Sequence, residues 1–435
     1  MNTNNTWHFL PLMIIFILLI SITGIAEPTL SWIKIEVNRQ DIFVDRWLRE
    51  KLSGDWTGAE QFIHDVAIVY RDSDGLHLES IINRKGQHLL PYSREKISIF
   101  ALSNDIVELH QGDSMYLYNT RTDQLSDLGS IKLIATDSYT EGINEPLFLA
   151  FHNGFYGYVD GSAQCIIPFC WKDAGPFSEG LAFVSNDTFT GFIDVKGKRT
   201  IDSNGKWFSA SPFKEGFSVV MINDAVTGII NTKGEIITTL KPYHDGYIDQ
   251  FLHDGFLLVS DGEHHYFIDP QGNMLAGKYW RDARCFSNGY AAVMNDDNVW
   301  GFIDTKGQMV IPYRYDAVDW YYEHYAGFDE NDRTWVFIHN TQALINTKGD
   351  QLTTQPMLFC PEYSVNTENR LSSAYVVYDE AKKKYGVINT QGDIVYPLTY
   401  KQIEVLQGDI LKLYTDVKII FGDAQGNIFF CVPTE

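Results

Sequence analysis

Short apolar stretches separated by polar turns run along the chain from about residue 80 to its end. The turns repeat one pattern: two apolar residues, Asp or Asn, two variable residues and Gly, as in FIDTKG at 302–307. Asp or Asn at the first turn position can accept hydrogen bonds from nearby backbone amides, and Gly at the fourth supplies the positive φ of a type I turn with a bulge. Each copy therefore predicts a β-hairpin. The copies are IINRKG (81–86), FIDVKG (192–197), IINTKG (229–234), FIDPQG (267–272), FIDTKG (302–307), LINTKG (344–349), VINTQG (387–392) and FGDAQG (421–426).

Two degenerate copies, LYNTRT (117–122) and YVDGSA (158–163), complete a series that recurs about every 38 residues. This period lies among those of β-propeller blades and other stacked repeats. Several hairpins are preceded by an apolar residue three positions before a glycine, namely Phe177, Phe213, Leu252 and Phe286, and then by an apolar strand. Each repeat therefore reads as a meander of at least three short strands. The prediction is an all-β fold of about ten tandem repeats of roughly 38 residues, either propeller-like, an open β-solenoid or two smaller propellers.

Proline and the remaining pattern refine this picture. Because proline cannot donate to a sheet ladder, Pro168, Pro312 and Pro397 are expected to end the strands that follow their turns. Few or no helices are expected after residue 60.

The amino-terminal region has a different pattern. Residues 9–25, FLPLMIIFILLISITGI, are apolar and uncharged, and small residues at Gly24 and Ala26 suit signal-peptidase cleavage after Ala26. An uncleaved membrane anchor is the alternative, because the run is just long enough to span a bilayer. Residues 42–52, IFVDRWLREKL, place apolar residues loosely on one helical face and predict a short helix. The expected division is a signal peptide or anchor at 1–26, a linker with this helix and lead-in strands at 27–78, and the repeat domain at 79–435.

Composition narrows the class of partner. The 34 Lys and Arg residues stand against 56 Asp and Glu, and the formal net charge of -22 repels phosphate backbones, so nucleic acid is not expected as a partner. The five cysteines at 165, 170, 285, 360 and 431 include no CxxC pair and give no zinc-site spacing. Cys165 and Cys170 could pair across a hairpin in an oxidising compartment, but buried free thiols are the preferred interpretation.

No pattern of residues indicates catalysis, a cofactor or a metal. A calcium ladder built from the repeated Asp and Asn would need several oxygen ligands per repeat, whereas the turn explains one. The stretch RDSDGLHLE (71–79) lacks the ligand spacing of an EF-hand, so Gly75 is assigned to an ordinary hairpin turn. The histidines at 244, 253, 264 and 265 show no HxH or HxxxH spacing and are interpreted as exposed loop residues. No GxSxG, HExxH or phosphate-binding glycine loop is present. We therefore assign no catalytic, cofactor-binding or metal-ligating residue.

With these residues assembled, the chain resembles the WG repeat family, also known by its KWG form, over roughly residues 80 to 430. The family is recognised by an aromatic-Gly pair followed by FID.KG and IP..Y, and Trp300-Gly301 is the true Trp-Gly pair of this chain. Tyr156-Gly157 and Tyr385-Gly386 keep an aromatic, whereas Thr190-Gly191 and Thr227-Gly228 do not. The resemblance implies an exported or domain-attached β module that acts in interactions and has no catalytic residues of its own.

The expected function is that of a non-catalytic exported repeat protein that serves as a protein-interaction scaffold. The alternative is binding of carbohydrate or a cell-envelope polymer on an aromatic-rich surface such as Trp320, Tyr321 and Tyr322. A hydrolase with a propeller active site ranks third. The expected location is periplasmic, extracellular or at the cell surface, with membrane contact only through residues 9–25 if they are not cleaved.

Overall fold

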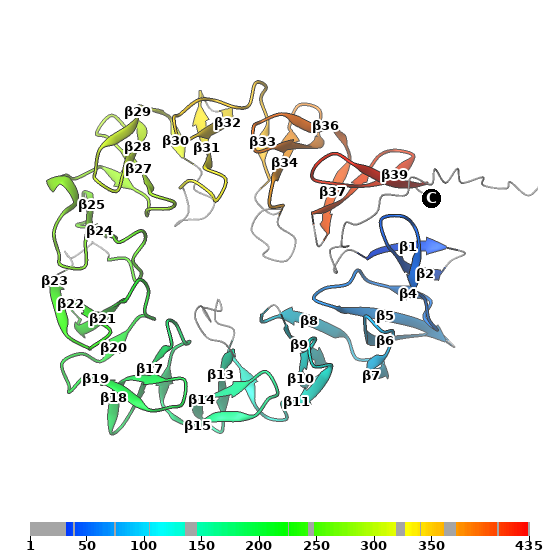
Figure 1. Cartoon of the computed structure of the whole chain (residues 1–435), viewed down its shortest axis with the longest axis horizontal. Coiled ribbons are helices and arrows are strands. Elements are labelled where there is room, and N and C mark those ends of the chain that lie inside the picture. The colour runs from blue at the N-terminus through cyan, green and yellow to red at the C-terminus, as the bar shows by residue number, and fades with distance from the viewer. Residues whose placement is uncertain are drawn as a thin grey trace, which may run out of the picture.

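In the computed structural model, the protein is a single ring of small antiparallel sheets (Figure 1). The structure describes residues 32–433 except 38–39, 74, 104, 135–145, 225, 242–247, 319–326, 340, 361–370 and 407–408. Within these residues there are eleven sheets and one 3-10 turn, η1 (Leu275–Gly277). The expected all-β, propeller-like fold is confirmed, and the repeats form one ring instead of an open solenoid or two smaller rings.

The first half of the ring contains six sheets. The first is β1 (Ile33–Val37), β2 (Gln40–Val44) and β3 (Glu50–Leu52), followed by β4 (Gly58–Ala59), β5 (Val66–Ser73), β6 (Leu76–Asn83) and β7 (His88–Ser93). Next are β8 (Ile97–Ala101), β9 (Ile106–Gln111), β10 (Ser114–Asn119) and β11 (Gln124–Asp127), then β12 (Lys132–Leu133), β13 (Leu147–His152), β14 (Phe155–Asp160) and β15 (Cys165–Trp171). Two further sheets are β16 (Asp173–Ala174), β17 (Leu181–Asn186), β18 (Phe189–Asp194) and β19 (Arg199–Asp202), and β20 (Ser209–Ala210), β21 (Phe217–Asn223), β22 (Val226–Asn231) and β23 (Ile236–Leu240).

The second half contains five sheets. They are β24 (Leu257–Ser260) and β25 (His265–Ile268); β26 (Asp282–Ala283), β27 (Tyr290–Met294), β28 (Trp300–Asp304) and β29 (Met309–Tyr315); and β30 (Ala317–Val318), β31 (Arg333–Ile338) and β32 (Thr341–Asn346). The last two are β33 (Leu358–Phe359), β34 (Ala374–Asp379), β35 (Lys384–Asn389) and β36 (Ile394–Tyr400), and β37 (Gln402–Leu406), β38 (Ile410–Tyr414), β39 (Lys418–Asp423) and β40 (Ile428–Pro433).

Each repeat sheet is a meander in which strands adjacent in sequence are adjacent in space. The first strand of a repeat lies toward the centre of the ring and the last lies at its circumference (Figure 1). Most repeats have four strands, because a two-residue first strand such as β16, β20 or β26 precedes the three that the sequence predicts.

The Asp or Asn that recurs in each copy of the turn pattern, called the marker below, makes the predicted turn. The Asp304 Oδ1 atom accepts the N–H groups of Lys306 and Gln308, both at 2.9 Å, and Gly307 has a φ of 73°. The Gly307 N–H also donates to the Asp304 carbonyl at 2.9 Å, as a type I turn with a bulge requires. These bonds occupy one carboxylate oxygen with backbone amides, which supports the turn interpretation of the markers.

Many of the repeated Asp and Asn residues also bond to the side chain four positions later. At Asn83, Asn231, Asn346 and Asn389 the amide nitrogen donates to that side chain, as from Asn346 to Asp350 at 3.0 Å and from Asn389 to Asp393 at 3.2 Å. Where the marker is Asp, the later residue is Lys, Asn or Gln, and Asn427 donates to Asp423 at 2.8 Å. These side-chain bonds add to the backbone bonds of the turn within the same hairpin.

The glycine of the aromatic-Gly pair makes room for a bulge in the outermost strand. Between the Trp300–Tyr315 and Phe302–Ile311 pairs, β29 holds two residues more than β28. A Cβ on Gly301 would lie 2.7 Å from the Ile311 carbonyl oxygen, so only glycine fits there without a shift.

The expected role of the prolines is wrong in one respect. Pro168, Pro312 and Pro397 lie inside β15, β29 and β36, within the corresponding irregular stretch of each ladder. The missing N–H is tolerated because the bulge interrupts the ladder and the strand is at the edge of its sheet.

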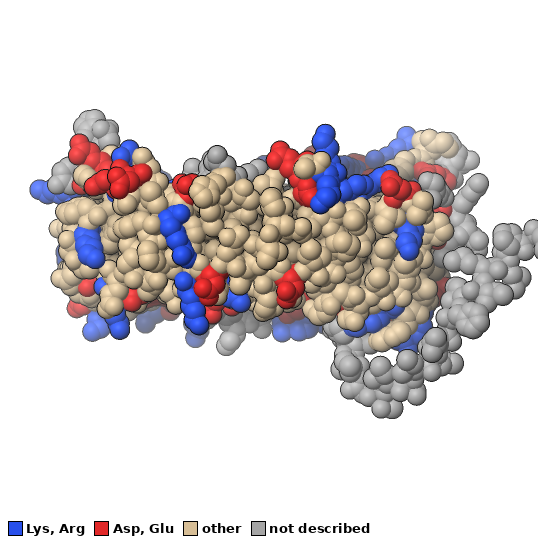
Figure 2. Space-filling view, turned by 90° about the horizontal axis from the view of Figure 1, so that it is seen from above, with Lys and Arg blue, Asp and Glu red and all other residues tan. Residues whose placement is uncertain are grey.

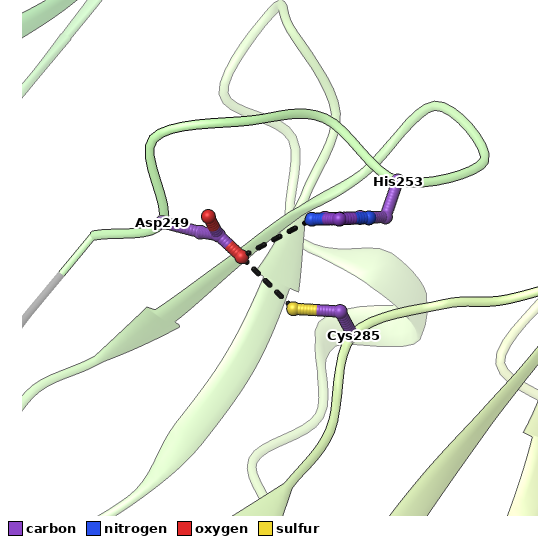
Figure 3. Close-up of side chains that lie close together, drawn as sticks. All are labelled: Asp249, His253 and Cys285. Atoms are coloured by element: carbon purple, nitrogen blue, oxygen red, sulfur yellow. Dashed lines mark hydrogen bonds and ion pairs between the residues drawn. The ribbon is translucent and has the colours of Figure 1, made fainter. Parts of the chain in front are cut away.

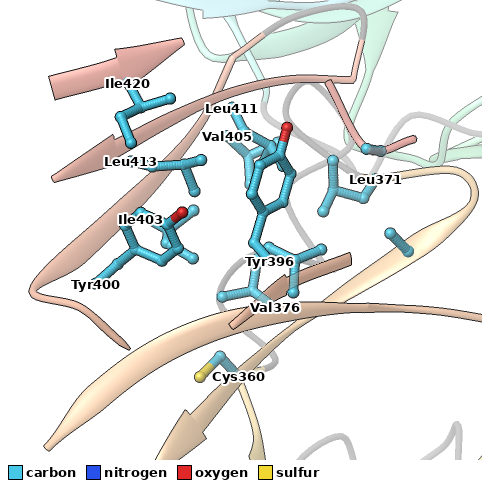
Figure 4. Packing of buried hydrophobic residues seen from close by; sticks show 13 residues of the cluster. Cys360, Leu371, Val376, Tyr396, Tyr400, Ile403, Val405, Leu411, Leu413 and Ile420 are labelled. Carbon is cyan, nitrogen blue, oxygen red and sulfur yellow. The ribbon is translucent and has the colours of Figure 1, made fainter. Parts of the chain in front are cut away.

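Neighbouring sheets bury their faces against each other. Phe177, Phe213, Leu252 and Phe286 are all buried, and Phe177 packs on Tyr158 of the preceding sheet with ring centroids 4.8 Å apart. Figure 4 shows the packing between the last two sheets, where Tyr396 and Tyr400 meet Ile403, Leu411 and Leu413. One sheet cannot cover both of its faces, so the core is distributed between sheets around the ring.

The ring closes by face-to-face packing of its first and last sheets. Ile33 and Val44 are buried against Ile410, Phe421 and Phe430. No strand from one end of the described chain enters the sheet of the other end.

The short helix expected over residues 42–52 is wrong. These residues form the end of β2, a turn and β3, because the apolar side chains of Phe43 and Val44 face opposite sides of a strand and are both buried. The boundary expected at residue 79 lies inside β6, so the first repeat sheet begins at β4.

Residues 1–31 lie outside the described part, and with them the expected signal peptide or anchor. In the part of the chain that the structure describes, no helix has the length and apolar character needed to cross a membrane.

Candidate functional site

The two rims of the ring carry different kinds of connection. Because each repeat is an up-and-down meander, its Asp/Asn turn and the loop between its first two strands lie at one rim, which we name the turn rim. The loops between its second and third strands lie at the opposite rim, the loop rim. Loop-rim segments differ in length and sequence, as in 187–188, 261–264, 295–299 and 380–383.

Hydrogen bonds join neighbouring repeats along the turn rim. The Glu179 carboxylate accepts the Gly216 N–H at 2.9 Å, and the Glu215 carboxylate accepts the Gly255 N–H at 2.6 Å. The Asp254 carboxylate continues the series to the Gly289 N–H at 2.7 Å. These acidic residues have φ values between 50° and 55° and precede positive-φ glycines, as in the type I′ hairpin turn. The acidic side chains of this rim are therefore used for assembly of the ring.

Charged side chains gather mainly near the two rims, and the wall between them is mostly uncharged (Figure 2). The wall includes the outermost strands β29, β36 and β40, whose first residues Met309, Ile394 and Ile428 are exposed.

One cluster of potential metal ligands lies between two repeats. Asp249 and His253 belong to the segment before β24, and Cys285 lies between β26 and β27 (Figure 3). The Cys285 Sγ atom lies 2.9 Å from the Asp249 Oδ2 atom, and the His253 Nε2 atom lies 3.5 Å from the same oxygen. Cys285 is buried, and the side chains of Asp249 and His253 are 11% and 13% exposed.

The surroundings shift the pKa values of two of these groups. Burial and the Asp249 carboxylate raise the pKa of Cys285, which is consistent with a thiol that donates to Asp249. For Asp249, burial acts to raise the pKa, but hydrogen bonds from His253, Cys285 and the Phe251 N–H outweigh it and leave the pKa lowered. The cluster thus combines a carboxylate, an imidazole and a thiol in a largely dry site.

The interpretation of the histidines as exposed loop residues is wrong for His253 and His265. Their side chains are 13% and 18% exposed, whereas His264 is 46% exposed and His244 lies outside the described residues. The His253 side chain is covered because its backbone pairs with Phe256 and holds the imidazole against the next repeat.

The expectation of buried free thiols needs a similar correction. Cys165 and Cys170 have free thiols but are exposed, because β15 is an edge strand at the circumference of the ring. Cys285 and Cys360 are buried and form no disulfide, and Cys431 is exposed.

Sequence reasoning missed the cluster, although the repeat contained a signal. Asp249 lies six residues before the glycine in the loop between the first two strands of its repeat. In other copies this position holds alanine, namely Ala174, Ala210 and Ala283. Cys285 likewise stands where Pro176 and Pro212 stand. Both residues are departures from the repeat at positions next to the core.

A cavity of about 360 Å³ lies where the first and last sheets meet. Its lining includes Lys34, Glu60, Tyr70, Glu404 and Lys412. The Lys412 ammonium lies 3.2 Å from the Glu404 carboxylate, and the Tyr70 hydroxyl donates to Glu60. Because these groups pair with one another, the cavity is best explained as part of the junction that closes the ring.

The other residues considered from sequence fall in two groups. Trp320, Tyr321 and Tyr322, considered for glycan stacking, lie outside the described residues. Gly75 has a φ of 76° between β5 and β6 and makes the predicted hairpin turn.

Comparisons with known proteins agree with the repeat pattern. Four segments, residues 156–187, 267–298, 300–333 and 385–410, match the model of the WG containing repeat. No curated protein matches the sequence.

Solved structures that match parts of this chain are distant from it in sequence. BamB from Moraxella catarrhalis is 8% identical with a TM-score of 0.29, covering 70% of this chain and 92% of its own. A eukaryotic initiation factor is 10% identical with a TM-score of 0.38, covering 74% of this chain and 94% of its own. Hsv2 from Kluyveromyces lactis is 10% identical with a TM-score of 0.27, covering 76% of this chain and 98% of its own. Likenesses of this strength carry no argument about function.

Proposed function

Because this chain belongs to the WG repeat family, we propose that it is a non-catalytic, exported repeat protein that acts as a protein-interaction scaffold. One observation carries the proposal: the polar residues that recur in the repeats are engaged in turns and in bonds between repeats. Asp304 and Asn389 bond to backbone amides of their own hairpins, and Glu179 and Glu215 bond to the next repeat. The segments between the second and third strands, on the loop rim, differ in length and sequence between copies, and recognition residues concentrate in such loops in many folds.

The outer wall supports the same proposal. Met309, Ile394 and Ile428 expose apolar side chains at the starts of outermost strands, and the wall between the two rims is mostly uncharged. A ring of stacked repeats is also rigid over a large area, so it can present several such patches at fixed spacing.

Export is proposed from the amino-terminal run at residues 9–25 and the small residues that follow it. The acidic net charge of -22 suits a soluble envelope or extracellular protein that avoids anionic surfaces.

The test compares the two rims. The tagged full chain is used to recover partners from its host, and each recovered protein is then purified and titrated against three forms of the chain. The forms are the wild type, a loop-rim variant with Asp224→Asn, Asp296→Asn and Asp297→Asn, and a turn-rim control with Lys233→Gln, Lys306→Gln and Lys348→Gln. All six side chains are exposed.

A saturable complex that the loop-rim variant weakens at least about tenfold, and the turn-rim control leaves unchanged, supports the proposal. Equal weakening by both variants contradicts the assignment to the loop rim. Turnover of a hydrolase substrate panel contradicts the non-catalytic assignment. Binding to a glycan array that is lost in Trp320→Ala, with no protein complex, replaces the proposal with glycan recognition.

A further inference from the structure

We propose that Asp249, His253 and Cys285 bind one Zn²⁺ ion, which cross-links two neighbouring repeats of the ring. This site is independent of the scaffold function proposed above.

The ligand set and its spacing fit this ion. Cys sulfur, His nitrogen and Asp oxygen are the donors that zinc prefers, at about 2.0 to 2.3 Å in tetrahedral geometry. Tetrahedral bonds of these lengths separate neighbouring ligand atoms by about 3.3 to 3.5 Å. The three donor atoms here lie within 4.8 Å of one another, and the His253 Nε2 to Asp249 Oδ2 distance is 3.5 Å. Small side-chain movements therefore suffice to surround an ion, with a fourth position for water.

The backbone already holds the three side chains in place. The Asp249 Oδ1 atom accepts the Phe251 N–H at 3.1 Å, which leaves the Oδ2 atom directed at His253 and Cys285. Figure 3 shows these three side chains converging from two separate segments. The hairpin at His253 and Phe256 and the bridge between Ser287 and Tyr290 fix the two segments on either side. Organisation of this kind lowers the entropy that binding would otherwise cost.

Charge balance also favours a divalent cation. Asp249 brings a carboxylate into a largely buried place beside the Cys285 thiol. Binding Zn²⁺ releases one proton from the Cys285 thiol to solvent, so a thiolate, a carboxylate and the ion make a neutral site. The nearest cation in sequence, Arg284, is directed to Asp282 at 2.7 Å and does not take the place of the ion.

The position of the cluster between two repeats means that a bound ion would stabilise their contact. The sheet of β24 and β25 has only two strands among the described residues, whereas the next sheet has four. Asp249 and His253 lie in the segment before β24 and Cys285 lies between β26 and β27, so an ion would join two neighbouring repeats. Asp249 and Cys285 replace the Ala and Pro of the equivalent repeat positions, and these replacements supply two of the three ligands.

The experiment uses the full chain with its exposed thiols removed by Cys165→Ser, Cys170→Ser and Cys431→Ser. Zn²⁺ is titrated in competition with a chromophoric chelator, and Co²⁺ is used as a spectroscopic probe of thiolate ligation. We expect one equivalent of Zn²⁺, a thiolate-to-cobalt charge-transfer band, and a rise in thermal midpoint on adding Zn²⁺.

Ligand variants and a matched control decide the assignment. Cys285→Ser should abolish the cobalt band, and His253→Gln and Asp249→Asn should each weaken Zn²⁺ binding at least about 100-fold. Cys360→Ser removes another buried thiol and should leave binding unchanged. Circular dichroism checks that each variant is folded, and if Cys285→Ser is not, the His253→Gln and Asp249→Asn results decide. Absence of stoichiometric binding, a missing cobalt band, or equal binding by the folded ligand variants would overturn the proposal.

Discussion

The glycines of the aromatic-Gly position provide a graded test of the ring geometry. A Cβ on Gly191 would lie 2.0 Å from the Ile201 carbonyl oxygen, and one on Gly301 would lie 2.7 Å from the Ile311 carbonyl oxygen. These contacts are with backbone of the bulged outer strand, which cannot rotate away as a side chain can. Gly175 is the control, because its Cβ would meet only the Phe183 Cβ atom at 3.9 Å.

The expected magnitudes follow from two opposing effects. Overpacking of this kind costs about 1 to 3 kcal/mol of unfolding free energy. Replacing glycine by alanine also reduces the entropy of the unfolded chain and stabilises by about 0.4 to 1 kcal/mol. We therefore expect Gly191→Ala to destabilise by about 2 kcal/mol, Gly301→Ala by about 1 kcal/mol, and Gly175→Ala to be neutral or slightly stabilising.

Urea unfolding followed by tryptophan fluorescence measures these changes. Trp207 packs on Phe192 in the same repeat as Gly191, so its emission reports on the affected sheet. Equal stability of all three variants, or greater loss in Gly175→Ala than in Gly191→Ala, would refute the explanation of these glycines by close approach of the outer strand.

Three further predictions concern other parts of the chain. Asn389→Asp should lower the unfolding free energy by about 1 kcal/mol, because it places a second carboxylate against Asp393. The loss should be smaller at high salt. Adding Asp393→Asn should restore stability, which a double-mutant cycle of unfolding free energies measures. The Lys85 ammonium and hydrogen bonds from neighbouring side chains lower the pKa of Asp123 to about 2. The contribution of Asp123 to stability is therefore present above about pH 4 and is lost as pH falls toward 2. In Asp123→Asn the unfolding free energy should depend less on pH over that range. Cleavage after Ala26 should give an exported protein whose amino-terminal sequence begins at residue 27, whereas an intact amino terminus in the membrane fraction would identify an anchor.

Local rules account for the parts of the fold that the sequence predicts. The turn at Asp304 and Gly307 depends on bonds among five consecutive residues, so its pattern is visible wherever it recurs. The two-residue strand β16 is too short to show periodicity, and the prediction of three strands per repeat missed it. The segment after Ile42 has apolar residues at spacings that suit both a helix and a strand. Its first residues form a strand because they pair with β1.

Contacts between distant segments account for most of what the sequence does not show. Closure of the ring depends on Ile33 meeting Phe421, and neither residue belongs to a pattern that identifies the other. Cys285 meets Asp249 only because their repeats stack, so a search for ligand spacing along the chain finds neither. Comparison of each copy with the others at the same repeat position would have identified both as exceptions.

The way the ring closes has a consequence for its biogenesis. The sheet of β1, β2 and β3 is the first described sheet to be synthesised, but the face that contains Ile33 and Val44 is covered only by the last sheet. Almost the whole chain must emerge before that apolar face finds its partner. Until then the growing chain is an open arc with an exposed apolar sheet face at each end, and either face can pack against a second chain as readily as against its own. Dilution and chaperones that shield the first sheet should therefore favour single rings over joined ones.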